Sequence, residues 1–549
     1  MSAVKAAYFG IDALRDCLNV LIEHGYEITS VFTIEDDAYD RTAEICRYAQ
    51  EHHIPLHTTR VTAEDIRALE DAGVSISVTA GYPWKIPLSD TIMQLNIHPA
   101  LLPVGRGAWP MPVAILKNCS SGVTLHKLAR DFDRGDILLQ EEIPLDSGET
   151  LVTLSEKIAQ TAPRLLGEFL ERPQFLWENA REQAEGEYWP EPSDEDRTIS
   201  PTDSAAKAER VLRAFDGYGS LCTLGGVPIV IEEGRCLAGG GALPKEGLTL
   251  ELSDGVLLIT KWNPYFREIT LADRSTMEAI RSRHPSELSD FTFPLLYCWR
   301  KALQLQVHIG QDFFLVKSGD SLFCPVGDAA QYIPYLKGLL ALEKQLTLRF
   351  CDTAYAAVIR DAFGEQAVCT LCRDDCDYIL ENQLLESLSG GALGKRRNDF
   401  HHYSSLLPPP ETEAVTKENL HHVRELSQAS RAEDYPAQEE AIRHFEELGL
   451  EGVLVKRGQR YVGFALASQK EPDVMQGHFS KTIDEERGAA LYTVRACSVQ
   501  GMEKYSYTNL EDDMGDEGLR CFKQSLHADL ISSFTIDIKE VPLFEKEMV

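Results

Sequence analysis

The N-terminal part of the chain alternates short apolar runs with amphipathic stretches, and this alternation constrains the fold more than any other feature. Residues 6–10 form an apolar run that ends in glycine, residues 11–24 are amphipathic, and residues 27–33 form a second apolar run. A strand, a helix and a second strand in this order make a parallel βαβ unit. Further helices and strands are expected at residues 39–52, 54–56, 64–72 and 74–79. The sequence therefore predicts a doubly wound α/β sheet, in which ligands bind at the carboxyl ends of the strands.

At 549 residues the chain is too long for one hydrophobic core, and domains of roughly 100–200 residues would make about three. A polar, proline-containing stretch at residues 185–204 is typical of a linker. Short β-like runs separated by glycines follow it and predict a small β-rich, barrel-like module. We expect a first domain at residues 1–185, this module at 190–285, and a third region at 286–549, which a break near residues 407–416 would divide into two lobes.

Charge and cysteine content narrow the class of protein. The formal net charge is −32, which repels nucleic-acid phosphate. The thirteen cysteines are an odd number and scattered, as expected for reduced thiols. Cys369, Cys372 and Cys376 lack a fourth ligand nearby, so no metal is predicted. Without a signal peptide or an apolar run long enough for a bilayer, we expect a cytoplasmic protein with no membrane association, and the sequence is compatible with a homo-oligomer.

Polar residues gather at the end of one expected strand. Asn96 and His98 are two positions apart in residues 95–99, so both side chains point to the same face. A loop with two glycines at residues 105–107 lets the backbone approach a ligand, and Asp133 lies in a later acidic loop. Each residue alone is typical of a satisfied turn, whereas the three together predict a site.

The three residue types suit the transfer of an acyl group to an amine. An amine that attacks a formamide-like carbonyl creates an oxyanion and must lose a proton. Asn96 can donate to the oxyanion. His98 can donate or move protons, and Asp133 can orient it or take the amine proton through water.

Three segments carry a family resemblance, namely residues 96–103, 122–126 and 133–136. Their order and content resemble the 10-formyltetrahydrofolate-dependent formyltransferases, which include methionyl-tRNA, glycinamide ribonucleotide and amino-sugar-nucleotide formyltransferases. The resemblance extends to about residue 180. It implies 10-formyltetrahydrofolate as formyl donor and Asn96, His98 and Asp133 as catalytic residues. His126 follows an apolar strand and is compatible with either a pocket-lining or a buried structural role.

The resemblance also implies that folate binds between the loop at residues 81–87 and the loop at residues 131–133. Trp84 offers an apolar wall, although the first loop departs from the commoner family pattern through Pro83 and Trp84. The residues expected to bind the cofactor are Trp84, Lys85, Ile86, Asp131 and Phe132.

The middle region, about residues 188–273, resembles the C-terminal domain of methionyl-tRNA and amino-sugar formyltransferases. In the tRNA enzymes a basic loop after the second strand grips the acceptor, whereas this chain has the acidic run Glu35, Asp36 and Asp37 there. Together with the net charge, this difference disfavours a tRNA. We expect a small-molecule amine, such as an amino-sugar nucleotide or a modified amino acid of the hydroxyornithine type.

The C-terminal region, roughly residues 290–538, resembles the C-terminal domain of phosphatidylglycerol lysyltransferases, a variant of the GNAT acyltransferase fold. The segments at residues 388–398, 461–465, 478–481 and 509–520 carry this resemblance. It predicts an α+β region, tandem if there are two lobes. Lys395, Arg396 and Asn398 are candidates for binding phosphate. Asp512, Asp513 and Glu517 are candidates for holding an amine. Charged turns of this kind are equally typical of a solvated surface.

These expectations lead to one preferred hypothesis and two alternatives. The preferred hypothesis is a bifunctional tailoring enzyme that formylates an amine and, using acyl-CoA or acetyl-CoA, acylates the same or a related metabolite. The first alternative is a formyltransferase whose C-terminal region serves binding or assembly. The second is a metabolite sensor with degenerate sites, which the intact Asn96, His98 and Asp133 disfavour.

Overall fold

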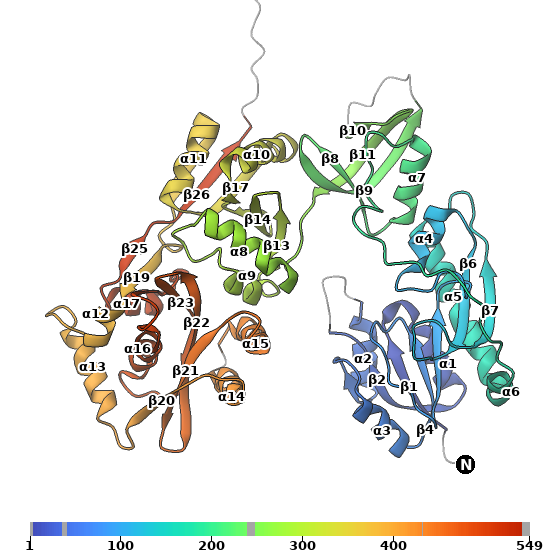
Figure 1. Cartoon of the computed structure of the whole chain (residues 1–549), viewed down its shortest axis with the longest axis horizontal. Helices are drawn as coiled ribbons and strands as arrows, with labels where there is room; N and C mark the ends of the chain where they lie inside the picture. The colour runs from blue at the N-terminus through green and yellow to red at the C-terminus, as the bar shows by residue number, and fades with distance from the viewer. Residues whose placement is uncertain (1–3, 36–40, 239–246, 431, 541–549) are drawn as a thin grey trace, which may run out of the picture. The chain divides into compact units, whose positions relative to one another are not determined.

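The structure is a computed structural model and describes residues 4–35, 41–238, 247–430 and 432–540. Two compact units make up the chain. Unit 1 comprises residues 1–224 and 228–263, and unit 2 comprises residues 225–227 and 264–549. Figure 1 colours the elements of both units in chain order. Asp36 and Asp37 of the acidic run lie outside the described residues.

Unit 1 contains a seven-stranded sheet in the order β3-β2-β1-β4-β5-β6-β7. Its strands are β1 (Val4–Gly10), β2 (Tyr26–Phe32), β3 (Leu56–His57), β4 (Val74–Ala80), β5 (Met93–His98), β6 (Ser121–Lys127) and β7 (Ile137–Ile143). The pairings from β3 to β5 are parallel, and β6 and β7 add antiparallel pairs. The predicted α/β sheet is confirmed, with an antiparallel extension beyond β5.

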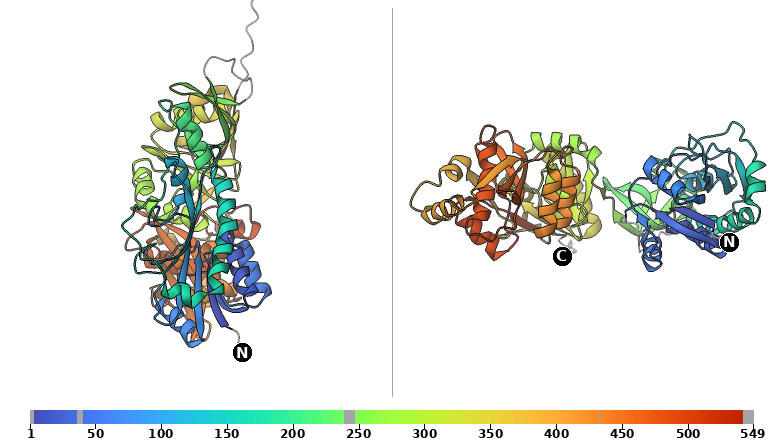
Figure 2. Two further views of the ribbon diagram at one scale, coloured as in Figure 1. Left: turned by 90° about the vertical axis from the view of Figure 1, so that its right-hand side faces the viewer. Right: turned by 90° about the horizontal axis from the view of Figure 1, so that it is seen from below.

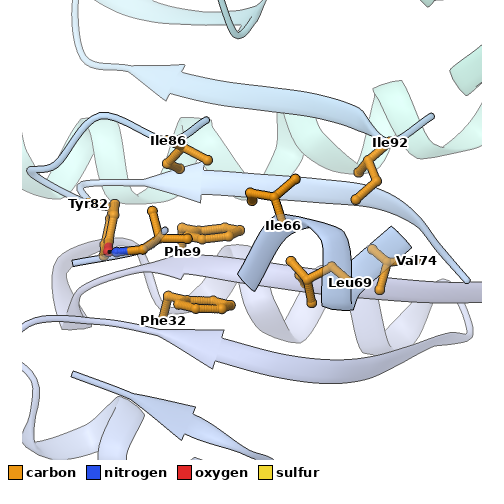
Figure 3. Close-up of a cluster of buried hydrophobic side chains, with 10 residues drawn as sticks. Phe9, Phe32, Ile66, Leu69, Val74, Tyr82, Ile86 and Ile92 are labelled. Atoms are coloured by element: carbon orange, nitrogen blue, oxygen red, sulfur yellow. Dashed lines mark hydrogen bonds between the residues drawn. The ribbon is translucent and has the colours of Figure 1, made fainter. Parts of the chain in front are cut away.

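Helices lie on both faces of this sheet. They are α1 (Asp16–Glu23), α2 (Ala43–Glu51), α3 (Ala63–Asp71), α4 (Pro110–Lys117), α5 (Leu151–Glu171) and α6 (Pro173–Glu178). Phe9 of β1 stacks on Phe32 of β2 at 4.5 Å between ring centroids, in a buried cluster with Ile66 and Leu69 of α3 (Figure 3). Tyr8 points to the opposite face and donates a hydrogen bond to the carbonyl of Leu14, just before α1. The strand alternation therefore builds two apolar layers.

The predicted β-rich module is a four-stranded sheet in the order β10-β11-β9-β8. Its elements are α7 (Ala205–Ala214), β8 (Ser220–Leu224), β9 (Val227–Ala238), β10 (Leu248–Glu251) and β11 (Gly255–Pro264). Over the described residues the sheet keeps two edge strands, β10 and β8, and so is open where a barrel was expected. Its fold belongs to unit 1, whereas residues 264–285 of the expected module pack within unit 2.

Unit 2 contains two mixed sheets, and the chain passes from the first to the second and back. The first has the order β12-β13-β14-β15-β17-β26-β18, with β16 paired to β14. Its strands are β12 (Arg267–Glu268), β13 (Gln306–Ile309), β14 (Phe313–Ser318), β15 (Ser321–Phe323), β16 (Val326–Gly327), β17 (Gln345–Cys351), β18 (Ala367–Leu371) and β26 (Phe534–Lys539). Strand β26, the last one in the described residues, thus lies between two much earlier strands, antiparallel to both.

The second sheet has the order β20-β21-β22-β23-β24-β19-β25. Its strands are β19 (Asp377–Glu381), β20 (Pro410–Ala414), β21 (Glu451–Arg457), β22 (Arg460–Glu471), β23 (Val474–Thr482), β24 (Tyr507–Asn509) and β25 (Asp529–Ile531). The segment at residues 407–416, expected to be a break between lobes, instead contributes the edge strand β20, paired to β21 along five residues. The prolines there do not end a lobe, because proline is tolerated in an edge strand. The chain instead passes from the first sheet to the second between β18 and β19.

The described residues of unit 2 contain ten α-helices around these sheets. They are α8 (Arg274–Arg283), α9 (Phe293–Trp299), α10 (Ala329–Glu343), α11 (Thr353–Phe363), α12 (Asn382–Ser387), α13 (Gly394–Ser404), α14 (Leu420–Ser430), α15 (Tyr435–Arg443), α16 (Ala489–Gly501) and α17 (Glu517–Gln524). Figure 2 shows the ribbon from two further directions. The expected α+β character is present, and the GNAT assignment stays a prediction. None of the helices in the described part of the chain has the length and apolar character that a membrane span requires.

Candidate active site

Strand β5 delivers two of the predicted catalytic residues to one place. Asn96 and His98 stand on the same face of β5, at its carboxyl end. Asn96 pairs directly with His126 of the neighbouring strand β6. His98 and His126 are buried and Asn96 is half-buried. The strand alternation seen in the sequence therefore places an amide and an imidazole at the edge of the sheet where ligands bind in α/β folds.

His126 fixes the orientation of the Asn96 amide. Nδ1 of His126 lies 2.8 Å from the carbonyl oxygen of Lys127, so this nitrogen carries the hydrogen and donates. Nε2 is then the acceptor, and it receives a hydrogen bond from Nδ2 of Asn96 at 3.0 Å. Burial, and then the neighbouring His98, lower the pKa of His126 to about 4, which keeps the ring neutral in this arrangement.

His98 is held between a backbone carbonyl and a carboxylate. Nε2 of His98 donates to the carbonyl oxygen of Gly105 at 2.7 Å. Nδ1 faces Oδ1 of Asp133 at 3.4 Å. Because an unprotonated Nδ1 and a carboxylate oxygen would repel each other, this geometry requires a proton between the two groups. His98 and Asp133 thus form a proton-holding pair.

The loop that carries Asp133 has an unusual backbone. Asp133 adopts φ +57°, the left-handed region that side chains rarely occupy. Its Oδ2 accepts from the backbone N–H of Gly107 at 3.0 Å, and its Oδ1 lies 3.4 Å from Nδ2 of Asn96. A Cβ at Gly135 would lie 1.8 Å from the carbonyl oxygen of Lys127, so only glycine fits there. The local strain aims the Asp133 carboxylate at Asn96 and His98.

The two loops expected to bind folate meet in the structure. Nζ of Lys85 lies 4.0 Å from Oδ1 of Asp131 and 5.5 Å from the ring centre of Phe132. Phe132 is 56% exposed and offers an aromatic face. Trp84 is partly buried against the core cluster of unit 1, and Ile86 is part of that cluster, which makes Ile86 a support of the loop more than a contact residue.

Unit 2 contains a cavity of about 720 Å³. Its walls are largely apolar and come from both sheets and from α9, α16 and α17, with Leu296, Trp299, Phe350, Met475 and Phe522 among them. Carboxyl groups also line it, including those of Asp290, Glu511 and Asp512. The cavity therefore combines a large apolar surface with buried acids.

Burial shifts the pKa values of Asp290 and Asp512 in the cavity and of the neighbouring Asp377. Oδ2 of Asp290 is buried and accepts no hydrogen bond from any described residue. Burial, and then the charge of Asp377, raise the pKa of Asp512 to about 8 and raise that of Asp290 well above its usual range. Burial likewise raises the pKa of Asp377 to about 6. The cluster therefore holds protons near neutral pH, which a bound cation could replace.

The structure separates the three acids expected to hold an amine. Asp512 lines the cavity. Asp513 is fully buried and binds Arg520, Arg373 and the hydroxyl of Tyr378, with Nη2 of Arg520 at 2.6 Å and Nη1 of Arg373 at 3.2 Å. These partners hold the pKa of Asp513 far below its usual range. Glu517 is exposed in the first turn of α17. Of the three, Asp512 is therefore the one placed to meet a ligand in this cavity.

The expected phosphate-binding residues lie together at the start of α13. Lys395, Arg396 and Asn398 line a shallow hollow with Arg487. Asp399 lies in the same hollow, where Arg396 and Arg487 pair with it at 3.3 and 2.9 Å. Part of the positive charge is thus neutralised within the protein.

Sequence reasoning missed several residues that the fold brings to these sites. Asp290, Asp377 and Lys523 are far apart in the chain, and no local pattern marks them. Nζ of Lys523 donates to the carbonyl oxygen of Leu510 at 2.5 Å and supports the loop that carries Asp512. The thiols of Cys369, Cys372 and Cys376 are free, and over the described residues no cluster of potential ligands is suited to a metal.

Two family models match the chain. The formyl transferase model matches residues 12–170, and the model of the C-terminal part of phosphatidylglycerol lysyltransferase matches residues 281–536. Methionyl-tRNA formyltransferase of Thiobacillus denitrificans is 27% identical over 255 residues, which are 44% of this chain and 82% of the relative.

Two solved structures are also similar. A Bacteroides thetaiotaomicron protein of unknown function is 24% identical, with a TM-score of 0.46, covering 50% of this chain and 99% of that protein. An N-formyltransferase from Helicobacter canadensis, in complex with folinic acid and dTDP-3-aminofucose, is 18% identical, with a TM-score of 0.38, covering 48% of this chain and 100% of that enzyme. With the two family matches, the chain joins a formyl transferase domain to a domain of the phosphatidylglycerol lysyltransferase C-terminal type.

Proposed function

We propose that unit 1 transfers the formyl group of 10-formyltetrahydrofolate to an amine of a small metabolite. The observation that carries this proposal is the convergence of Asn96, His98 and Asp133 at the end of β5. An amide donor, an imidazole and a carboxylate within hydrogen-bonding reach of one another are the groups that transfer of an acyl group to nitrogen requires.

The reaction needs no oxidant or reductant. A bond forms between the acceptor nitrogen and the formyl carbon, and the bond between that carbon and the folate nitrogen breaks. One proton leaves the acceptor amine and one proton reaches the folate nitrogen. The products are a formamide and tetrahydrofolate, so the protein must stabilise an oxyanion and move a proton.

Asn96 is placed to stabilise the oxyanion. One hydrogen of its amide group is committed to Nε2 of His126 at 3.0 Å. The second is only loosely held, because its contact to Asp133 is 3.4 Å long. This hydrogen is the one that can turn to a developing negative charge.

The pair of His98 and Asp133 is placed to move the proton. Nδ1 of His98 and Oδ1 of Asp133 face each other at 3.4 Å, a geometry that favours one shared proton between them. The pair can give this proton to the departing folate nitrogen and take the proton that the acceptor amine releases. Its charge is then restored after each transfer.

The surface that the two loops make supports a folate site. The aromatic ring of Phe132 is exposed for contact with a planar group, and the ammonium of Lys85 lies beside it for a carboxylate or a carbonyl. The Helicobacter canadensis enzyme was crystallised with a folate derivative, which supports a folate donor here.

The acceptor is proposed to be a small amine, such as an amino-sugar nucleotide or a hydroxyornithine-type amino acid. The names of the curated relatives state a tRNA acceptor. For this chain the net charge of −32 argues against binding a polyanion. We therefore place the small amines first and make methionyl-tRNA an arm of the test.

The experiment incubates the full chain with 10-formyltetrahydrofolate and a panel of amino-sugar nucleotides, hydroxylated diamino acids and methionyl-tRNA. Release of tetrahydrofolate and mass spectrometry of the formamide are followed. We expect turnover with a small amine that is lost in Asn96→Ala and kept in Asn179→Ala, whose exposed side chain only bonds its own helix. Turnover with methionyl-tRNA alone would overturn the acceptor class, and no folate turnover with any amine would overturn the function.

For unit 2 we propose a second reaction, acylation of the same or a related metabolite from acyl-CoA. The supporting observation is the cavity, whose apolar walls suit an acyl chain and whose acid Asp512 suits an amine. The bond between the acyl carbon and sulfur breaks, a bond to the amine nitrogen forms, and the amine proton passes to a carboxylate and then to the released thiolate.

The test for unit 2 measures release of free CoA thiol from acetyl-CoA and longer acyl-CoAs in the presence of the formylated and unformylated amines. We expect a rate that falls in Asp512→Asn and is unchanged in Asp529→Asn, whose side chain is exposed on β25. If no acyl-CoA reacts while folate turnover persists, unit 2 serves binding or assembly and the acylation proposal fails.

A further inference from the structure

A segment beyond the formyl transferase match crosses both loops of the candidate site. The family match ends at residue 170, and the segment at residues 179–204 follows α6. Arg181 bridges to Ile137, where β7 begins, with two backbone hydrogen bonds of 2.8 Å. Further on, Trp189 donates its N–H to the carbonyl of Arg106 at 2.7 Å. The residues in between are therefore stretched from one active-site loop to the other.

Gln183 lies in this span and uses both ends of its amide group. Its Nε2 donates to the backbone carbonyl of Asp133 at 2.9 Å and to that of Gly135 at 2.6 Å. Its Oε1 accepts from Nε and Nη2 of Arg106 at 3.2 and 2.8 Å. Both hydrogens of the amide NH2 group and both acceptor directions of Oε1 are thus used. The NH2 group therefore faces the Asp133 loop, and the oxygen faces Arg106.

The two loops that Gln183 joins are the ones that position His98 and Asp133. Arg106 lies between Gly105, whose carbonyl accepts from His98, and Gly107, whose N–H donates to the carboxylate of Asp133. The other end of the Gln183 amide holds the backbone of Asp133 itself. A closed ring of hydrogen bonds therefore runs from His98 through the Gly105–Gly107 loop and Gln183 to Asp133.

We propose that Gln183 is a positioning residue for formyl transfer, which sets the separation of His98 and Asp133 by clamping their two loops together. The proposal rests on the function proposed for unit 1. It adds a residue that lies outside the family match and touches neither His98 nor the Asp133 carboxylate.

The segment that carries Gln183 packs closely against the Gly105–Gly107 loop, and the Asp133 loop has a strained backbone. Asp133 is held at φ +57°, a conformation that persists only when neighbouring groups enforce it. A Cβ at Gly107 would lie 2.0 Å from the carbonyl oxygen of Trp189, so the segment presses directly on the loop. The Arg106 side chain is buried, and the acceptors of its hydrogen bonds are Gln183 and the carbonyl of Ala184. Removal of Gln183 would release both loops.

The first experiment compares Gln183→Leu, Gln183→Glu and the control Gln174→Leu. Leucine removes all four hydrogen bonds. Glutamate keeps an acceptor for Arg106 but places a carboxylate against the two carbonyl oxygens, which pushes the Asp133 loop away. Gln174 is exposed and bonds only Glu178 of its own helix, so its replacement leaves both loops in place.

We expect kcat to fall roughly 10- to 100-fold in both Gln183 variants, as for a displacement of about 1 Å at a reacting group, with the KM for 10-formyltetrahydrofolate little changed. Gln183→Glu should unfold at a higher temperature than Gln183→Leu, because Arg106 keeps its partner. Gln174→Leu should match the parent in every measurement. If Gln183 had a purely structural role, Gln183→Glu would keep the kcat of the parent protein. That result would overturn the proposal.

A second measurement does not depend on turnover. The protein is labelled with ¹⁵N-histidine, and the ring signals of His98 are assigned with His98→Gln. We expect Gln183→Leu to shift these signals and Gln174→Leu to leave them unchanged, since the hydrogen bonds of His98 to Gly105 and Asp133 define its ring nitrogens. Unshifted His98 signals in Gln183→Leu would exclude the clamp even if the amine substrate were still unknown. Shifted signals in a protein without folate turnover would support the clamp and count against the proposed function alone.

Discussion

Asn96 and His126 face each other across the β5–β6 pair, and the amide nitrogen of Asn96 donates to Nε2 of His126 at 3.0 Å. The imidazole is committed to this acceptor role because its other nitrogen donates to the carbonyl of Lys127. His126, whose sequence context is equally typical of a buried core residue, thus determines which way the amide of the candidate catalytic residue Asn96 points.

Replacement of His126 by leucine should therefore remove the orientation of the Asn96 amide without removing a contact to the substrate. We expect kcat to fall by roughly 10- to 100-fold, approaching the loss expected for an oxyanion-stabilising donor, because the Asn96 amide is free to rotate. Steady-state kinetics with 10-formyltetrahydrofolate would measure this. The combination with Asn96→Ala should be no slower than Asn96→Ala alone, and multiplied effects would show that His126 acts independently.

The neutral state of His126 predicts a pH dependence of stability. Its pKa is about 4 in the folded protein, whereas the unfolded chain has the ordinary value of about 6.5. Between these values the unfolded state binds a proton that the folded state does not, so the free energy of unfolding falls as the pH falls through this window. The full effect is about 3 kcal/mol.

Urea unfolding of the parent protein and of His126→Gln between pH 7 and pH 4 would measure this dependence. The variant should lose stability less steeply on acidification, because glutamine does not titrate. His24→Gln, which replaces an exposed histidine at the end of α1, should follow the parent curve. Parallel curves for all three proteins would contradict the prediction.

The exposed ring of Phe132 predicts a loss in donor binding. We expect Phe132→Ala to raise the KM for 10-formyltetrahydrofolate by roughly threefold to tenfold with little change in kcat, as for the loss of one aromatic contact. Phe175 of α6 is a matched control, because it is 57% exposed where Phe132 is 56% exposed. If both alanine variants behave alike, the folate lies elsewhere.

The buried ion pairs of Asp513 predict a structural effect in unit 2. Asp513→Ala leaves Arg520, Arg373 and Tyr378 without their shared partner and should lower the free energy of unfolding by about 2 kcal/mol or more. Glu517→Gln changes an exposed carboxylate nearby and should have almost no effect on the unfolding temperature. Calorimetry of the two variants would separate a structural acid from a surface acid, and equal unfolding temperatures would refute the prediction.

The parts of unit 1 that depend on local pattern could be predicted from the sequence. Strand alternation placed Asn96 and His98 on one face, and the family resemblance added Asp133. Gln183 could not be found in this way, because a glutamine in a polar, irregular segment has no periodicity and its partners are backbone carbonyls. Asp512 was among the candidates from the sequence, whereas Asp290 and Asp377 were missed for a related reason, since they approach Asp512 only through tertiary folding.

At residues 407–416 the sequence predicted a boundary between lobes that the structure does not have. Prolines and charges there suggested a boundary, yet β20 pairs with β21 as a sheet edge. An edge strand tolerates proline because one side of it makes no ladder hydrogen bonds. The true change of sheet, between β18 and β19, takes only residues 372–376, which are charged but contain no proline.

The position of β26 has a consequence for how unit 2 is made on the ribosome. Strand β26 lies between β17 and β18, although more than 160 residues separate it from β18 in the chain. During synthesis β17 and β18 each keep one edge unpaired until residues 534–539 have emerged from the ribosome. Unit 2 therefore cannot complete itself from its N-terminal half, and a nascent chain that stalls before residue 534 exposes edges that invite aggregation or chaperone binding.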